Sequence, residues 1–256
     1  MTRPIILTIA ILLLLAPDAF SQGKKKPNPN INESKEFANV FHSPSADKTP
    51  KVFRSVIQLE LVIKRGDNDA QVQYVDGTVV SSDGLIATVF DEPGANKSDL
   101  GGIESASLLM LDGSGVAAKV VAYDSAYGVA ILRVADLKLP HLTLSKKSLV
   151  AKQRLNWHAV YKNGRRTFLY TRPLQIHKSA HMVGETEDLC QVIDPGTSAL
   201  SAERSGSALL AHDGSLVALM GWQKHWNVTP KNSPPRKKLA WVVPAQVVAK
   251  MLAGIK

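Results

Sequence analysis

Short apolar runs, each bounded by turn-forming residues, follow one another along the chain after residue 50. This spacing is typical of an all-β sandwich or barrel. Two of the turns, Ser81–Gly84 and Asp112–Gly115, place glycine where a hairpin needs a positive φ. The strands predicted up to residue 140 are Ser55–Ile63, Val72–Val80, Leu85–Val89, Ala106–Leu111, Val116–Tyr123 and Val129–Val134, and Leu137–Pro140 starts a crossover.

The rest of the chain shows the same kind of pattern and then changes to a helical one. Lys162–Gly164 supplies an Asn-Gly turn, and Asp213–Gly214 supplies an Asp-Gly turn between the middle pair of strands. Pro244 suits the first turn of a helix, and the apolar spacing of Ala245–Leu252 predicts a closing helix over 244–254. The strands predicted here are Trp157–Tyr161, Arg166–Ile176, Leu189–Ile193, Ser207–Ala211, Leu216–Trp222 and Leu239–Val243.

Residues 1–21 have the pattern of a signal peptide. Arg3 precedes the apolar run Ile5–Ala16, and small residues lead to an expected cleavage after Ser21. The run is too short to cross a bilayer of about 30 Å as a helix. We therefore expect an exported protein, periplasmic or secreted, with no stable membrane insertion after the leader is cleaved.

Residues 22–50 are rich in Pro, Asn, Lys and Ser, and this composition predicts a disordered linker. The folded part is then 51–256. It contains one cysteine, Cys190, so no internal disulfide can support it and the core must suffice. A small buried thiol is the expected state of Cys190.

Charge is distributed in blocks along a chain whose formal net charge is +9. Residues 51–145 carry 8 bases and 12 acids, whereas 146–178 carry 9 bases and no acid. Residues 179–223 carry 1 base and 6 acids, and 224–256 carry 7 bases and no acid. Such blocks create a field that could attract an anionic partner. The alternative is that a solvated basic face only keeps the protein soluble.

Three stretches resemble the trypsin-like serine proteases, and most closely their bacterial HtrA/Deg branch: Gly77–Thr88, Asp124–Leu132 and Glu203–Leu210. In that family the first stretch leads to T-x-x-H with the general base, the second carries the orienting aspartate, and the third carries the nucleophile in a Ser-Gly-Gly context. The resemblance implies a double six-stranded antiparallel β-barrel with a short C-terminal helix. The first barrel would span about 51–140 and the second about 153–243.

The same resemblance implies that the catalytic triad is degenerate. Asp91 stands at the general-base position, Gly128 at the orienting position, and Ser205 at the nucleophile position. Serine is a poor nucleophile without a base whose pKa lies near neutrality, and a carboxylate with a pKa of about 3.9 is a weak substitute. Glycine has no side chain to orient an imidazole.

The oxyanion hole implied by the resemblance is also altered. Glu203 replaces the glycine whose backbone N–H would face the developing oxyanion, and Arg204 replaces a small residue. A Cβ resists the φ angles that glycine adopts, and a carboxylate there opposes the developing negative charge.

Other candidates for chemistry are weaker. His177 and His181 fall at a strand end and in a loop, where i, i+4 spacing does not bring ligands together, so we expect no metal site and no cofactor. His212 should point away from Ser205, and His225 is the one histidine that could act as a substitute base. The loop Lys224–Lys238 has five bases, no acid and one tryptophan, but no nucleic-acid motif accompanies it.

The sequence therefore favours an exported, catalytically inactive trypsin-like protein, a pseudoprotease that serves as a binding or structural module. Its expected partner is a protein or peptide, or an anionic polymer that meets the basic blocks. The alternative is an active serine endopeptidase that uses Ser205 as its nucleophile. A shifted alignment would not restore the base, because no histidine occurs between His42 and His141.

Overall fold

The computed structural model describes residues 41–42, 51–64, 70–90, 99–109, 114–136, 139–163, 166–178, 190–193, 205–221 and 239–255. In these parts of the chain, no helix has the length and apolar character needed to cross a membrane.

Six antiparallel strands pair in a closed ring to form the first barrel, in the order β2-β3-β4-β7-β6-β5. In β2, Leu59, Leu61 and Ile63 are fully buried and alternate with more exposed residues, because successive side chains of a strand face opposite sides of the sheet. The strands are β2 (Val56–Lys64), β3 (Ala70–Val79), β4 (Leu85–Val89), β5 (Ile103–Leu109), β6 (Gly115–Asp124) and β7 (Val129–Arg133).

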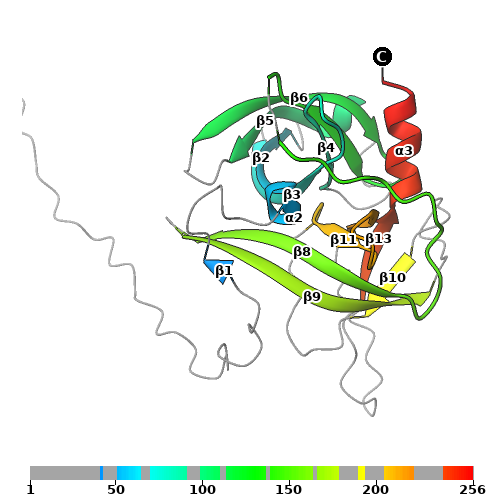
Figure 1. Ribbon diagram of the computed structural model, residues 1–256. Helices are drawn as coiled ribbons and strands as arrows, with labels where there is room; N and C mark the ends of the chain where they lie inside the picture. Colours follow the sequence, from blue (N-terminus) through cyan, green and yellow to red (C-terminus); the bar gives the residue numbers. More distant parts are fainter. Residues whose placement is uncertain are drawn as a thin grey trace, which may run out of the picture. The chain divides into compact units, whose positions relative to one another are not determined.

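The second sheet has the strand order β1-β9-β10-β13-β12-β11-β8. An additional pairing between β8 and β9 links six of these strands in a ring, and β1 joins the outer edge of β9. Figure 1 shows β8 and β9 as a long two-stranded ribbon. The strands are β1 (Phe41–His42), β8 (Arg154–Asn163), β9 (Arg166–Lys178), β10 (Cys190–Ile193), β11 (Ala208–Leu210), β12 (Leu216–Met220) and β13 (Leu239–Pro244).

The all-β class and the closing helix expected from the sequence are confirmed. The predicted turn glycines Gly84 and Gly214 have φ of 82° and 80°, which is the left-handed region that glycine enters without steric penalty. The helix α3 spans Ala245–Ala253, with Pro244 as its N-cap. It contacts β12 and β13 of the second barrel and β7 of the first.

Three elements were not expected from the sequence. The short helix α2 (Lys51–Arg54) precedes β2, and the 3-10 turn η2 (Asp99–Gly102) precedes β5. Strand β1 pairs with Phe168 and Leu169 of β9, although Phe41–His42 fall in the segment expected to be a disordered linker. Each is short, and the hydrophobic periodicity of so few residues carries little signal.

The core is shared between the barrels. In β4, Ile86 packs inside the first barrel, whereas Leu85, Ala87 and Val89 join residues of the second sheet, such as Leu219, in a common cluster. The residues of β7 also alternate between the common cluster and the interior of the first barrel. This double burial explains why both strands are mostly apolar, apart from Thr88 and Arg133, rather than alternating apolar with polar residues.

Candidate functional site

The turn that carries Ser205 precedes β11 and lies against β3 of the first barrel. The Asp76 N–H donates to the Ser205 carbonyl oxygen at 2.8 Å, and Thr78 Oγ1 donates to the Gly206 carbonyl oxygen at 2.9 Å. β3 is itself paired with β2 along its whole length. The Ser205 turn is therefore held against the first barrel by hydrogen bonds from β3.

Gly206 is required at its position by both conformation and space. Its φ is 84°, and a Cβ added there would overlap the carbonyl oxygen of Asp76 and the hydroxyl of Thr88. Its N–H donates to the Met220 carbonyl oxygen at 2.7 Å. The Ser-Gly pair thus allows the second sheet to approach β3 closely, which a larger residue would prevent.

Ser205 is fully buried. Its hydroxyl donates to the carbonyl oxygen of Gly221, just after β12, at 3.4 Å. A catalytic serine needs its hydroxyl bonded to a base and accessible to the carbonyl carbon of a substrate. Here the hydroxyl proton is directed to a backbone acceptor instead.

Gly128 ends the turn between β6 and β7, with φ of 65°. Its carbonyl oxygen accepts a hydrogen bond of 3.1 Å from the N–H of Phe90, the residue immediately before Asp91. The chain therefore brings the expected orienting position next to the end of β4. Asp91 and Glu203 themselves lie outside the described residues, so their assignments remain predictions.

Asp76 is a buried acid that the sequence analysis did not single out. Its Oδ2 accepts a hydrogen bond of 3.2 Å from the Val160 N–H on β8, and its carbonyl oxygen accepts one of 2.7 Å from Thr88 Oγ1 on β4. Asp76 therefore links β4, β8 and the Ser205 turn. Its sequence signal is that Asp76 is the single charged residue of the strand Ala70–Val79.

His158 is the histidine with the most distinctive environment among the described residues. It lies on β8, its Nδ1 is 2.6 Å from Thr171 Oγ1, and its ring meets that of Phe53 edge-on with centroids 5.3 Å apart. Burial lowers its pKa from 6.5 to about 4. His158 is thus neutral at pH 7, and its Nδ1 is engaged by Thr171.

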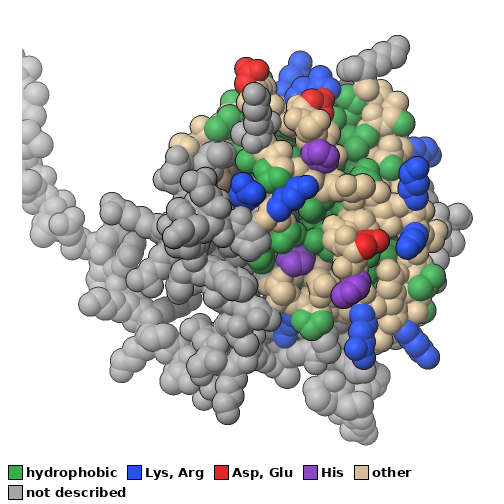
Figure 2. Space-filling view, viewed as in Figure 1, with side chains coloured by type: hydrophobic (Ala, Val, Ile, Leu, Met, Phe, Trp, Pro, Cys, Tyr) green, Lys and Arg blue, Asp and Glu red, His purple; other side chains and the backbone are tan. Residues whose placement is uncertain are grey.

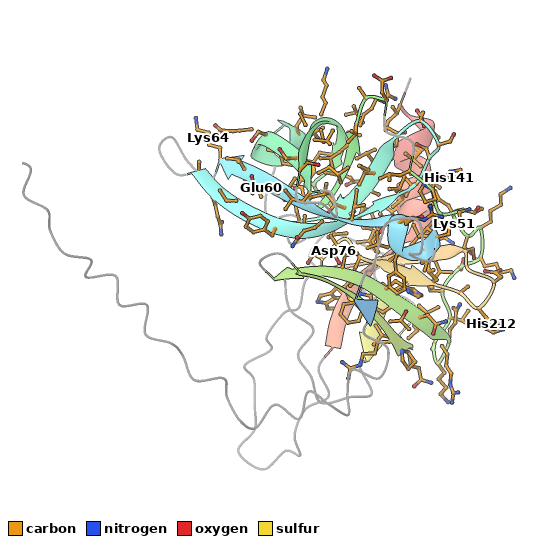
Figure 3. The ribbon with its side chains drawn as sticks, turned by 60° about the vertical axis from the view of Figure 1, so that its left-hand side comes forward. Lys51, Glu60, Lys64, Asp76, His141 and His212 are labelled. Atoms are coloured by element: carbon orange, nitrogen blue, oxygen red, sulfur yellow. The ribbon has the colours of Figure 1, made fainter. Side chains whose placement is uncertain are left out.

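Apart from His158, the histidines whose side chains the structure describes are His141 and His212. Figure 3 shows His141 and His212 well apart from Asp76, whose N–H bonds Ser205. His181 and His225 lie outside the described residues, as does the side chain of His177. Within the described parts of the chain, no group of three or more His, Cys, Asp or Glu side chains could hold a metal ion.

A closed six-stranded barrel, a second sheet that shares its core, and a Ser-Gly turn held between them define a serine-protease-type scaffold. The family model of the trypsin-like peptidase domain matches residues 75–219, and the chain belongs to this family. A comparison with curated proteins gave no match.

Solved structures with a similar fold include several bacterial proteases. The active form of the Rv3671c protease from M. tuberculosis has a TM-score of 0.58 at 18% identity, over 80% of this chain and 82% of that one. The HtrA-type protease AlgW with a tripeptide has a TM-score of 0.58 at 15% identity, over 80% of this chain. The serine endoprotease from Yersinia pestis has a TM-score of 0.54 at 14% identity, over 80% of this chain.

The chain covers 60% of AlgW and 63% of the Yersinia pestis enzyme, so it is similar to part of each. The expected resemblance to the trypsin-like superfamily is confirmed, and the HtrA-type neighbours agree with the expected branch at the level of the fold.

Proposed function

We propose that this chain is an exported, catalytically inactive trypsin-like protein that keeps the two-barrel scaffold as a binding or structural module for a protein or peptide. The observation that carries the proposal is the state of Ser205, whose hydroxyl is fully buried and bonded to the Gly221 carbonyl oxygen. Nucleophilic attack would require this hydroxyl to leave its acceptor and meet a base.

The orienting position gives a second reason for inactivity. Gly128 has no side chain with which to hold an imidazole in its working orientation. Triad members act as a unit, so the loss of base and orienter together removes nearly all triad catalysis.

The restored double variant Asp91→His with Gly128→Asp should therefore remain almost inactive. The expected Glu203 and Arg204 replacements disfavour the oxyanion hole, which the two substitutions leave unchanged. Hydrolysis of an unstructured protein such as casein measures this outcome. Proteolysis approaching that of trypsin in the double variant would contradict it.

The direct test is labelling of the wild-type chain with a serine-directed fluorophosphonate. We expect no labelling of Ser205 and no peptide hydrolysis, with trypsin as the positive control. The control variant Ser205→Ala should be indistinguishable from wild type in both assays. Stoichiometric labelling that Ser205→Ala abolishes would overturn the inactive assignment.

The alternative function, an active serine endopeptidase, has one observation in its favour. The Ser205–Gly206 turn is anchored to β3 by two hydrogen bonds, and Gly206 keeps a left-handed conformation. The backbone around the nucleophile position is therefore held by hydrogen bonds to the first barrel. The same labelling experiment distinguishes the two functions.

A protein or peptide partner is supported by the class of scaffold. AlgW, whose fold this chain shares over part of its length, was solved with a tripeptide. The basic blocks of the sequence favour an acidic partner.

Export is proposed from the N-terminal sequence alone. The mature chain should begin near Gln22, and N-terminal sequencing of the processed protein tests this. An intact 1–21 segment retained in membranes would contradict it.

A further inference from the structure

The last part of the connection between the two barrels, residues 146–154, carries exposed bases and no acid. We name it the basic ridge and define it by Lys146, Lys147, Lys152 and Arg154, all of which are exposed. In Figure 1 this connection runs down the right-hand side between β7 and β8, and Figure 2 shows Lys and Arg side chains along that edge.

The first part of the ridge is fixed to the fold rather than free. The Ser145 N–H donates to the Leu216 carbonyl oxygen at 2.8 Å, and Ser145 Oγ accepts from the Lys147 N–H at 3.1 Å. Gln246 Nε2 of α3 donates to the Lys147 carbonyl oxygen at 2.6 Å. The two lysines therefore project from a backbone held by both β12 and α3.

The helix α3 adds a further base beside the ridge. Lys250 is exposed and follows Gln246 by four residues, so it lies on the same face of the helix one turn further on. Because Gln246 contacts Lys147, this face of α3 adjoins the ridge.

The second part of the ridge is held in a strained conformation. Lys152 has a φ of 67°, which costs a non-glycine residue roughly 1–2 kcal/mol. Its N–H donates to the Ile176 carbonyl oxygen at 2.8 Å, and its own carbonyl oxygen accepts from Gln175 Nε2 at 3.2 Å. β9 thus fixes the turn that presents Lys152, and such retained strain occurs preferentially at functional sites.

One apolar side chain and one acid accompany these bases. Val150 is 58% exposed, one of the few large apolar residues so exposed in the described chain. Asp213 lies near Lys147: hydrogen bonds from Ser215 lower the pKa of Asp213 first, and the charge of Lys147 contributes to the same direction. Five bases against one acid leave the surface strongly positive.

We propose that the basic ridge, together with Lys250 and Val150, binds an acidic segment of a partner protein that includes an aliphatic residue. This proposal rests on the binding function proposed above and gives that function a location away from Ser205. Carboxylates would meet the lysines, and the aliphatic residue would cover Val150.

The composition of the ridge argues against other anionic partners. Residues 144–154 contain no aromatic side chain on which a nucleic-acid base could stack. A single exposed valine offers far less apolar surface than an amphipathic helix inserts into a membrane interface. An acidic peptide uses both the charges and the valine.

The test is fluorescence anisotropy of the full chain with a labelled twelve-residue probe of ten glutamates and two central leucines. The ridge variant Lys146→Glu/Lys147→Glu/Lys152→Glu is compared with Lys51→Glu/Lys64→Glu/Lys119→Glu, which changes three exposed lysines elsewhere by the same charge. Circular dichroism verifies that both variants are folded. Val150→Ser tests the apolar contact with the charge unchanged.

We expect wild-type binding that weakens as salt rises, at least tenfold weaker binding for the ridge variant, and less than threefold weakening for the control. Val150→Ser should weaken binding several-fold. Equal losses in the two triple variants would overturn the proposal, because net charge alone would explain them. Tighter, ridge-dependent binding of single-stranded DNA or phosphatidylglycerol vesicles, or ridge-dependent self-association without probe binding, would also overturn it.

These outcomes are separable from those of the proposed function. Loss of probe binding leaves fluorophosphonate labelling unaffected, whereas labelling of Ser205 would overturn the inactive assignment without affecting the ridge.

Discussion

Asp76 shows how a single buried residue can define a site. It touches the Ser205 turn through its N–H, β8 through its carboxylate and β4 through its carbonyl oxygen. Burial of a carboxylate is unfavourable unless hydrogen bonds compensate for the lost hydration. The arrangement therefore fixes the relative positions of three elements at the point where a protease of this family would present its nucleophile.

Gly206→Ala should strongly destabilise the fold. A methyl group there would meet Asp76 and Thr88 in addition to the strain of φ 84°, so we expect a loss of about 4 kcal/mol in the free energy of unfolding. Urea denaturation measures it. Gly214→Ala is the matched control, because its φ is 80° but no atom lies within 4 Å of the added Cβ, and it should lose only about 1 kcal/mol. Equal losses would contradict the packing argument.

His158 should make stability depend on pH. Burial lowers its pKa from 6.5 to about 4, so the folded state favours the neutral ring. As the pH falls from about 6.5 to 4, the unfolded chain takes up this proton first, and about 3 kcal/mol of stability is lost. Above pH 7 the contribution is constant.

Urea denaturation at pH 7.5 and 4.5 tests this prediction. His158→Gln should lose less stability than wild type between the two values, because it removes the titrating ring. An identical pH dependence in the two proteins would contradict it.

At the scale of elements, β3 connects the first barrel to the second sheet. It pairs with β2 in the first barrel, and near its C-terminal end Asp76 and Thr78 donate hydrogen bonds to the turn before β11. Hydrogen bonds from this strand thus join the first barrel to the second sheet at the candidate site.

Thr78→Val should weaken that junction. The substitution removes the buried hydrogen bond from Thr78 Oγ1 to the Gly206 carbonyl oxygen, and we expect a loss of about 1–2 kcal/mol. Thr143→Val, at an exposed position, serves as the control and should change stability by less than about 0.5 kcal/mol. Thermal unfolding compares them. A Thr78→Val protein as stable as the control would show that this bond is not stabilising.

At the scale of the molecule, the two barrels should unfold together. Leu85, Ala87 and Val89 of the first barrel pack with Leu216 and Leu219 of the second in one cluster, so neither barrel keeps an intact core without the other. The described tryptophans, Trp157 and Trp241, both belong to the second barrel.

Tryptophan fluorescence and far-ultraviolet circular dichroism should therefore give coincident unfolding transitions in urea. In a Trp222→Phe/Trp226→Phe background, which removes the two tryptophans outside the described residues, fluorescence reports the second barrel, whereas circular dichroism reports strands of both. Separate midpoints would contradict the shared core.

Much of the fold could be predicted from local pattern. Apolar runs and turn glycines such as Gly84 and Gly214 determine where strands begin and end, because alternation and positive φ are properties of neighbouring residues. The motif stretches also located Ser205 and Gly128 as positions of interest. The family resemblance depended on these short segments and is confirmed by the match over residues 75–219.

What only the tertiary structure decided are contacts between residues far apart in sequence. Three such contacts join separate elements: the hydrogen bond from the Ser205 hydroxyl to Gly221, the hydrogen bond from Val160 to Asp76, and the edge-on packing of His158 against Phe53. So does the contact of Gln246 with Lys147, which places Lys250 beside the basic ridge. Periodicity carries no information on such pairs, because they depend on how strands and helix pack once the barrels close.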